Sequence, residues 1–266
     1  MVGGDLAGKL LTHCALRCYH LRMTEPSAGG RRVAFFGGSF DPPHLGHLAV
    51  ARAAKAMLGL DSVLFAPVGA QPLKPLGSTV SFVHRLAMTR LAIAAEPGFA
   101  VSLADAPKPS GAPNYTLETL RALRAELPPE SVLFCLMGAD AFAGFRRWHR
   151  AAEIPFVAPL IVASRPGQPL DLKAALPEGL EIVLPPQSGA KTAEIELHSL
   201  ILRNREGALT PLYLLPRLDV PISASEIREQ MRMDEPVCSA SEDSGPERAL
   251  LPASVANYIQ IHSLYH

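Results

Sequence analysis

The sequence has little cysteine, no net charge and no long hydrophobic run, and each of these absences excludes a class of protein. Four cysteines in 266 residues are too few for the disulfide framework of a small secreted domain. Basic and acidic residues number 25 each, so no overall positive field attracts nucleic acid or an anionic membrane. Charged residues or proline interrupt every hydrophobic run before it reaches the roughly 18 residues of a membrane span. We therefore expect a soluble, cytoplasmic protein with neither nucleic acid nor membrane as a partner.

Proline is abundant, with 25 residues that fall mostly between the hydrophobic runs, where they mark loops. Residues 1–30 are interpreted either as a flexible leader or as an over-long start assignment, because Met23 offers a second start. Residues 31–266 are expected to form one domain, since the length allows a single large one. Within it we place an insertion at about 167–210 and a mobile loop at about 234–247, where the sequence is polar and aperiodic.

Short hydrophobic runs alternate with helical patterns from residue 31 onward. Helical spacing of hydrophobic residues predicts amphipathic helices at Leu45–Leu58, Phe82–Ala95 and Tyr115–Glu126. Brief hydrophobic runs predict buried strands at Val33–Phe36, Ser62–Ala66, Phe99–Leu103, Val132–Leu136 and Phe156–Ala163. This alternation predicts an α/β fold, a doubly wound (Rossmann-like) parallel sheet with helices on both faces. Ligands of such sheets bind beyond the carboxyl ends of the strands.

The regular alternation lapses after Gly167. Glu181–Leu184 is the one strand-like run of the insertion, and Pro211–Leu215 resembles a further strand. Ser223–Met233 and Pro252–Leu264 are expected to be C-terminal helical elements. Cys135 lies inside a hydrophobic run, so we expect a small buried core residue rather than a reactive thiol.

The stretch 37–47, which reads GGSFDPPHLGH, is the most informative part of the sequence. It follows a predicted strand, and Gly37 and Gly38 allow the backbone to turn and approach a ligand closely. A helix begins near its end, so free N–H groups and the positive helix terminus form a site for an anion. His44 and His47 lie three residues apart on one face of the first helical turn, where imidazoles can bind phosphate oxygens and stabilise developing charge.

A second stretch with polar residues at a helix start reads ISASEIR at 222–228. Ser223 and Glu226 form the S-x-x-E pattern of a capping box. Ser225 and Arg228 share a face of the first turn, where a hydroxyl and a guanidinium can meet one anion. Helix capping and a solvated arginine explain the same pattern, so this stretch alone leaves both interpretations open.

Together the two stretches resemble the nucleotidyltransferase superfamily with the H-x-G-H motif, and more closely the family of bacterial nicotinate-nucleotide adenylyltransferases. The resemblance covers roughly residues 31–265. Further stretches agree with the family in order: Lys74, Arg85–Met88, Asn114–Leu120, Gly138–Asp140, Trp148, Arg165–Gly167 and the ending Leu251–Tyr265.

The resemblance implies transfer of AMP from ATP to the phosphate of nicotinate mononucleotide, which gives deamido-NAD and pyrophosphate. It implies Mg²⁺ as the cofactor, held by the ATP phosphates and not by protein ligands. The residues that it implies for catalysis are His44, His47 and Arg228. Those that it implies for ATP and its phosphates are Gly37, Gly38, Ser39, Phe40, Lys74, Gly138, Asp140 and Ser225.

For the pyridine half, the resemblance implies Tyr115, Thr116, Trp148 and His149. Trp148 would be the stacking platform, and Thr116 would meet the carboxylate at a helix start. Each has a plainer interpretation, since Trp148 could be a core residue, and Thr116, like Asp140, could simply cap a helix. Two positions depart from the family pattern: Leu73 stands where the family usually has histidine, and His149 where many members carry tyrosine. These changes leave the role of the Lys74 loop and the specificity for the pyridine open.

Two alternatives remain at the level of the sequence. Adenylyl transfer could act on another phosphate acceptor, either nicotinamide mononucleotide or phosphopantetheine, and the Tyr115-Thr116 and Trp148 elements disfavour the second. Outside enzymes, the chain could be a nucleotide-binding module without turnover, which the intact His44, His47, Ser225 and Arg228 oppose. A homo-oligomer also stays open.

Overall fold

The computed structural model describes residues 29–73, 77–163, 170–183, 198–215, 223–233 and 250–265. Within these ranges the strands form one sheet of order β3-β2-β1-β4-β5-β8-β7-β6. Their bounds are β1 Arg32–Gly38, β2 Ser62–Pro67, β3 Phe99–Val101, β4 Val132–Gly138, β5 Leu160–Ala163, β6 Glu181–Val183, β7 His198–Arg203 and β8 Leu209–Leu215.

The sheet is parallel from β3 to β8 and antiparallel beyond β8. The predicted doubly wound parallel sheet is therefore confirmed for the strands from β3 to β8 in the sheet order. The predicted all-parallel sheet is corrected at one edge, where β8–β7 and β7–β6 pair antiparallel. A short connection explains the change of direction, because Asn204 to Ala208 joins β7 to β8 as a hairpin, and a parallel neighbour needs a much longer crossover.

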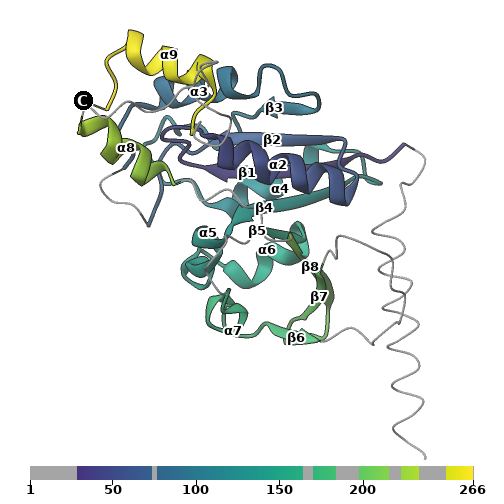
Figure 1. Ribbon diagram of the computed structural model, residues 1–266. Helices are drawn as coiled ribbons and strands as arrows, with labels where there is room; N and C mark the ends of the chain where they lie inside the picture. The colour runs from purple at the N-terminus through teal and green to yellow at the C-terminus, as the bar shows by residue number, and fades with distance from the viewer. Residues whose placement is uncertain are drawn as a thin grey trace, which may run out of the picture.

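Helices cover both faces of the sheet, with α9 beside α3 above it in Figure 1. Their bounds are α2 Leu45–Leu58, α3 Phe82–Ile93, α4 Thr116–Glu126, α5 Ala139–Ala143, α6 Ile154–Val157, α7 Leu172–Ala175, α8 Ala224–Arg232 and α9 Ala253–Ile261. Two 3₁₀ turns, η1 Phe145–Arg147 and η2 Ala151–Glu153, connect α5 to α6. In the described residues, no helix has the length and hydrophobicity needed to cross a membrane.

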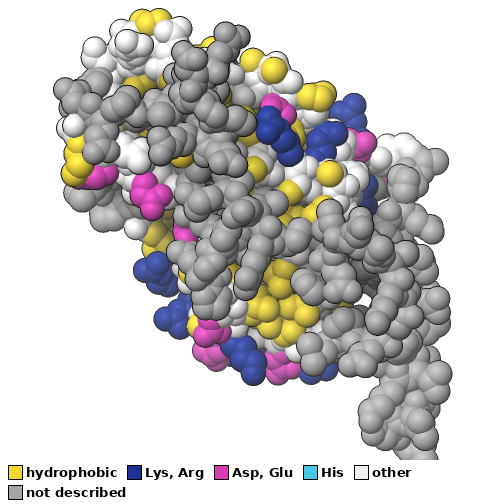
Figure 2. Space-filling view, viewed as in Figure 1, with side chains coloured by type: hydrophobic (Ala, Val, Ile, Leu, Met, Phe, Trp, Pro, Cys, Tyr) yellow, Lys and Arg dark blue, Asp and Glu magenta, His cyan; other side chains and the backbone are white. Residues whose placement is uncertain are grey.

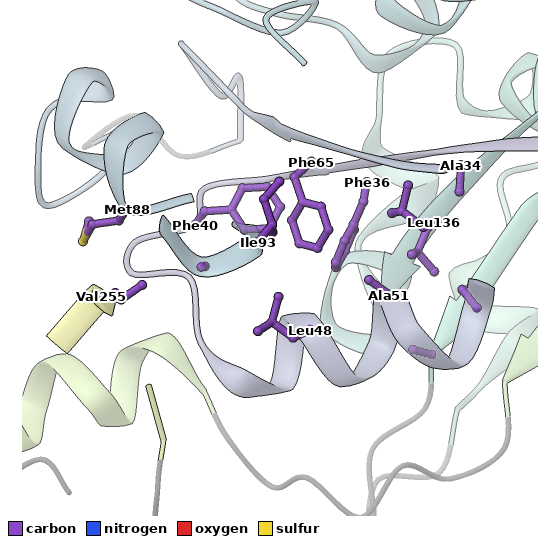
Figure 3. Packing of buried hydrophobic residues seen from close by; sticks show 14 of the residues in the cluster. Ala34, Phe36, Phe40, Leu48, Ala51, Phe65, Met88, Ile93, Leu136 and Val255 are labelled. Atoms are coloured by element: carbon purple, nitrogen blue, oxygen red, sulfur yellow. The ribbon is translucent and has the colours of Figure 1, made fainter. Parts of the chain in front are cut away.

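The side chains of β1 alternate between two hydrophobic cores, as expected of a strand buried on both faces. Ala34 and Phe36 pack on the side of α2, α3 and α9, whereas Val33 and Phe35 pack on the side of α4, α5 and α6. Figure 3 shows the first core, in which the ring of Phe40 lies beside those of Phe36 and Phe65. The loop that follows β1 is thus anchored in the core by its own aromatic residue.

The predicted strand Phe156–Ala163 is wrong in its first half. Residues Ile154–Val157 form α6, and only Leu160–Ala163 form β5. Pro155 explains the helical turn, because its fixed φ suits the first turn of a helix, where a missing N–H costs no hydrogen bond. A brief hydrophobic run does not separate helix from strand by periodicity alone.

Part of the predicted insertion is described, and it contributes α7, β6 and β7 to the antiparallel edge of the sheet. The prediction of a strand at 181–184 agrees with β6, while β7 was not predicted from the sequence. Residues 1–28 of the predicted leader 1–30, and the predicted loop at about 234–247, lie outside the described residues.

Candidate active site

One cavity of about 930 Å³ opens beyond the carboxyl ends of β1 and β4. These strands are neighbours at the point where the strand order reverses, which is where doubly wound sheets bind ligands. Of the predicted site residues, 14 line this cavity: Gly37, Gly38, Ser39, Phe40, His44, His47, Tyr115, Thr116, Gly138, Asp140, Trp148, His149, Ser225 and Arg228. Lys74 lies outside the described residues.

The two histidines of the H-x-G-H stretch form the first turn of α2 and lie ring against ring. Their ring centroids are 3.8 Å apart, and His44 is the N-cap of the helix. His47 Nδ1 accepts a hydrogen bond of 3.2 Å from the backbone N–H of His44. A neutral imidazole that accepts at Nδ1 carries its proton at Nε2. His47 therefore offers Nε2–H as a hydrogen-bond donor.

Phe40 has an unusual backbone and a buried ring. Its φ of 48° lies in the left-handed region, which non-glycine residues rarely adopt. The ring is 1% exposed and contacts His47 edge-on, with centroids 5.0 Å apart. A Cβ on Gly38 would lie 3.3 Å from this ring, which explains the glycine. Phe40 lines the cavity, and the burial of its ring indicates support of His47.

Arg228 and Ser225 on α8 face the same loop. Arg228 Nη1 donates to the backbone oxygen of Asp41 at 2.6 Å, and Nη2 donates to Ser225 Oγ at 3.1 Å. The predicted capping box is confirmed, because the Ser223 hydroxyl accepts from the N–H of Glu226 and the Glu226 carboxylate accepts from the N–H of Ser223. Ser223 and Glu226 therefore cap α8. Ser225 and Arg228 take no part in this cap, and both line the cavity.

Aromatic side chains gather in the part of the cavity formed by α4 and η1. The rings of Tyr115 and His149 are in contact at an interplanar angle of 36°, with centroids 4.5 Å apart. Trp148 is half-buried and meets the buried Phe145 edge-on at 5.5 Å. Trp148 therefore has one side in the core and lines the cavity, so both interpretations of this residue hold in part.

The capping interpretations of Thr116 and Asp140 are not supported. The N-cap of α4 is Tyr115, and Thr116 is the first helical residue. The N-cap of α5 is Gly138, and Asp140 is exposed in the first turn. Both side chains border the cavity from a helix start, where N–H groups and the helix dipole are available.

Comparison with known proteins agrees with these observations. The family model described as cytidylyltransferase-like matches residues 35–230. A protein of Gloeobacter violaceus named "Probable nicotinate-nucleotide adenylyltransferase" is 37% identical over 236 residues, which cover 89% of this chain and 97% of that protein. A protein of Dechloromonas aromatica with the same name is also 37% identical, over 91% of this chain and 99% of its own. This chain belongs to the nicotinate-nucleotide adenylyltransferase family.

The fold also agrees with that of a solved structure whose sequence is less similar to this chain than the two relatives above. The Plasmodium falciparum nicotinic acid mononucleotide adenylyltransferase, complexed with NaAD, superposes with a TM-score of 0.57 at 16% identity. The superposition covers 88% of this chain and 97% of that one. At 16% identity, this structural similarity supports the fold of this adenylyltransferase family member and nothing beyond the fold.

Several polar residues that line or border the cavity of this family member were not predicted from the sequence. Asn114 holds two loops together, because Oδ1 accepts from the N–H of Ala70 and Nδ2 donates to the oxygen of Ala106. Asp105 is 4% exposed and accepts from the Thr119 hydroxyl at 2.7 Å. Burial raises the pKa of Asp105, and the Thr119 hydrogen bond opposes that change. Asn114 belongs to a stretch shared with the family, whereas Asp105 lies in a loop without a motif.

Carboxylates do not cluster around the phosphate loop. Among the described residues, no group of three or more His, Cys, Asp or Glu side chains is placed to hold a metal ion. Asp41 is the carboxylate of the loop itself, and it already accepts from the Thr79 N–H and the Tyr265 hydroxyl.

Proposed function

We propose that this chain transfers AMP from ATP to the phosphate of nicotinate mononucleotide and so forms deamido-NAD and pyrophosphate. The observation that carries the proposal is the pair His44 and His47 at the start of α2, facing a cavity that also contains Trp148 and Tyr115. One end of that cavity suits phosphate groups and the other suits an aromatic ring. The family relationship supports the same reaction.

The reaction requires positioning and charge stabilisation more than acid–base chemistry. A phosphate oxygen of the mononucleotide forms a bond to the α-phosphorus of ATP, the bond from that phosphorus to the bridging oxygen of the β-phosphate breaks, and pyrophosphate leaves. His47 donates Nε2–H to phosphate oxygens on which charge develops, and His44 lies beside it. The backbone of Gly37, Gly38 and Ser39 lets the reacting groups approach closely.

The opposite wall of the phosphate end comes from α8. Arg228 and Ser225 would bind the β- and γ-phosphates and then the leaving pyrophosphate. Arg228 keeps N–H groups for this role, because its two hydrogen bonds to Asp41 and Ser225 use part of the five that a guanidinium has. Lys74 is proposed as a further cation, and Mg²⁺ on the triphosphate would supply additional charge neutralisation.

The remaining cavity residues are assigned to the adenosine of ATP and to the pyridine ring of nicotinate mononucleotide. Gly138 ends β4 and Asp140 lies in the first turn of α5, where its carboxylate would accept from the ribose hydroxyls of the adenosine. Trp148 and the neighbouring rings of Tyr115 and His149 would hold the pyridine ring. The hydroxyl and N–H groups at Thr116 would meet its carboxylate at the start of α4.

The cellular compartment and the partners of the protein are inferred from its composition and surface charge. We expect a cytoplasmic enzyme, since four cysteines fit a reducing compartment. We expect no nucleic-acid partner, because Lys and Arg are interspersed with Asp and Glu on the described part of the face in Figure 2, in agreement with a net charge of zero. The sequence leaves a homo-oligomer open.

Pyrophosphate release from MgATP tests the proposal, with nicotinate mononucleotide, its amide and phosphopantetheine as parallel acceptors. We expect the nicotinate acid to be used in strong preference. Equal use of the amide would contradict the carboxylate pocket at Thr116 and favour transfer to nicotinamide mononucleotide. If no pyrophosphate is released with any of the three acceptors, the result would favour a nucleotide-binding module without turnover.

A further inference from the structure

The C-terminal end of the described chain reaches the phosphate loop. Tyr265, which follows α9, donates its hydroxyl to Asp41 Oδ1 at 2.8 Å across 224 residues of sequence. Asp41 lies between the glycines and the histidines of the loop and is 4% exposed. Asp41 lines the cavity, whereas Tyr265 is not among the described residues that do. The tyrosine therefore acts on the site through Asp41.

Other parts of the chain hold the same three-residue segment, Ser39 to Asp41. Arg85 on α3 donates from Nη1 to the backbone oxygen of Ser39 at 2.6 Å. The backbone N–H of Thr79 donates to Asp41 Oδ2 at 2.6 Å. With Arg228 on the Asp41 oxygen, the segment is held from α3, α8, the loop before α3 and the C-terminal end.

The backbone is strained on both sides of the contact. Phe40, next to Asp41, has φ 48°, and Tyr265 has φ 72°. A non-glycine residue in this region is energetically unfavourable, and it persists only where surrounding contacts fix it. Strain of this kind is common where a site must be held in one geometry.

The Tyr265 hydroxyl is suited to remain a donor. Tyr265 is 6% exposed. Burial, and after it the charge of the neighbouring Asp41, raises the pKa of the phenol above its ordinary value. Both effects favour the protonated phenol, which is the form that donates this hydrogen bond. A charged carboxylate that accepts from a neutral O–H and a backbone N–H makes stronger hydrogen bonds than a neutral acceptor would.

We propose that Tyr265 is a positioning residue for adenylyl transfer, which holds Asp41 and thereby fixes the distance between the phosphate loop and the His44–His47 pair. The inference rests on the proposed function. Loss of the hydroxyl would let the loop relax, and a small displacement of the groups that stabilise the transition state costs turnover more than it costs substrate binding.

The test compares Tyr265→Phe with the matched control Tyr258→Phe. Both changes remove one phenolic hydroxyl from the C-terminal segment, but the hydroxyl of Tyr258 meets His84 Nδ1 at 3.1 Å, on the α3 side, and not the loop. We expect kcat to fall about tenfold in Tyr265→Phe, a value typical of lost positioning, with KM for nicotinate mononucleotide within about twofold. Tyr258→Phe should keep the kcat of the unmodified protein.

A double-mutant cycle with Asp41→Asn separates this role from general stability. Asparagine can still accept from the Thr79 N–H, but it removes the charged acceptor of the tyrosine hydroxyl, so the hydrogen bond between positions 41 and 265 loses its charge-assisted strength. We expect Tyr265→Phe to lower kcat by less than twofold in the Asp41→Asn background. Hydrogen exchange of the amides at 37–47 should accelerate in Tyr265→Phe and not in Tyr258→Phe.

Each outcome decides the inference. A kcat of Tyr265→Phe within twofold of the unmodified protein, or an equal loss in both backgrounds, overturns it while the proposed function stands. A loss of kcat without faster exchange at 37–47 overturns it as well. No turnover by the unmodified protein overturns the proposed function, and the inference falls with it.

Discussion

His47 accepts a hydrogen bond at Nδ1 from the backbone N–H of His44, and the two rings lie 3.8 Å apart. This relationship fixes two properties together. The bond satisfies an N–H group that a helix start otherwise leaves without a partner, and it fixes the tautomer that carries the proton at Nε2. The local structure of the helix start therefore prepares His47 for its proposed part in the chemistry.

Replacement of His47 by glutamine separates these two properties. Glutamine at the third helical position can reach back to the N-cap N–H, as in a capping box, but it lacks Nε2–H. We expect His47→Gln to fold with a Tm close to that of the unmodified protein and to lose about a hundredfold or more in kcat. Steady-state pyrophosphate release and a thermal melt check this. A His47→Gln variant with full activity would remove His47 from the proposed mechanism.

Arg228→Ala tests the wall formed by α8. The guanidinium contacts the Asp41 backbone oxygen and Ser225 and lines the phosphate end of the cavity. We expect KM for MgATP to rise about tenfold, as is typical for one lost charge-assisted hydrogen bond, with a smaller change in KM for the mononucleotide. Initial rates at varied MgATP concentrations measure this KM. Unchanged ATP kinetics would contradict the assignment.

Gly138 at the end of β4 and Gly69 in the loop after β2 should respond in opposite ways to substitution. A Cβ on Gly138 meets no heavy atom within 4 Å, and Gly138 lines the cavity. We expect Gly138→Val to keep the stability of the protein and to weaken MgATP binding several-fold, because the side chain enters space that the nucleotide needs.

Gly69→Ala is the comparison. A Cβ on Gly69 would lie 2.4 Å from the backbone nitrogen of Pro107. The backbone must move to admit it, so we expect a loss of about 1–3 kcal/mol in the free energy of unfolding. Denaturant melts of both variants check the contrast. Equal destabilisation by the two changes would contradict the close approach of Gly69 to Pro107 and the open space beside Gly138.

The sequence predicted the elements whose local signals agree with the final packing. The bounds of α2 were predicted residue for residue, because helical spacing ends at Gly59, whose φ of 56° stops the helix. The histidine pair was found for the same reason, since a short stretch contains the end of β1 and the start of α2. The predicted turn at Gly37 and Gly38 is wrong, because both glycines are the last residues of β1 and pair with β2.

The missed features depend on residues far apart in the sequence. No local pattern indicates that Tyr265 contacts Asp41, since only the packing of α9 against α3 brings them together. The antiparallel edge was missed because β7 lies in a stretch without regular alternation. Asp105 has no motif, and its place in the cavity follows from its bond to Thr119 on α4.

Cys135 gives a prediction about reactivity. Its side chain is 2% exposed in β4, and burial raises the pKa of the thiol to about 12. Only the thiolate reacts with alkylating agents, so we expect Cys135 to resist iodoacetamide at pH 8 in the folded protein and to react once the protein is unfolded. Mass spectrometry of the peptide that contains Cys135 measures the extent of modification. Rapid labelling of the folded protein would contradict the burial of this thiol in β4.

The most direct test of adenylyl transfer follows the fate of two phosphorus atoms of ATP. Purified protein is incubated with Mg²⁺ and nicotinate mononucleotide, and with ATP labelled at either the α- or the γ-phosphorus. Adenylyl transfer predicts that the α-label appears in a dinucleotide that co-migrates with deamido-NAD, while the γ-label appears only in pyrophosphate. An α-label that stays in ATP, or that appears in free AMP or ADP, would contradict adenylyl transfer to nicotinate mononucleotide.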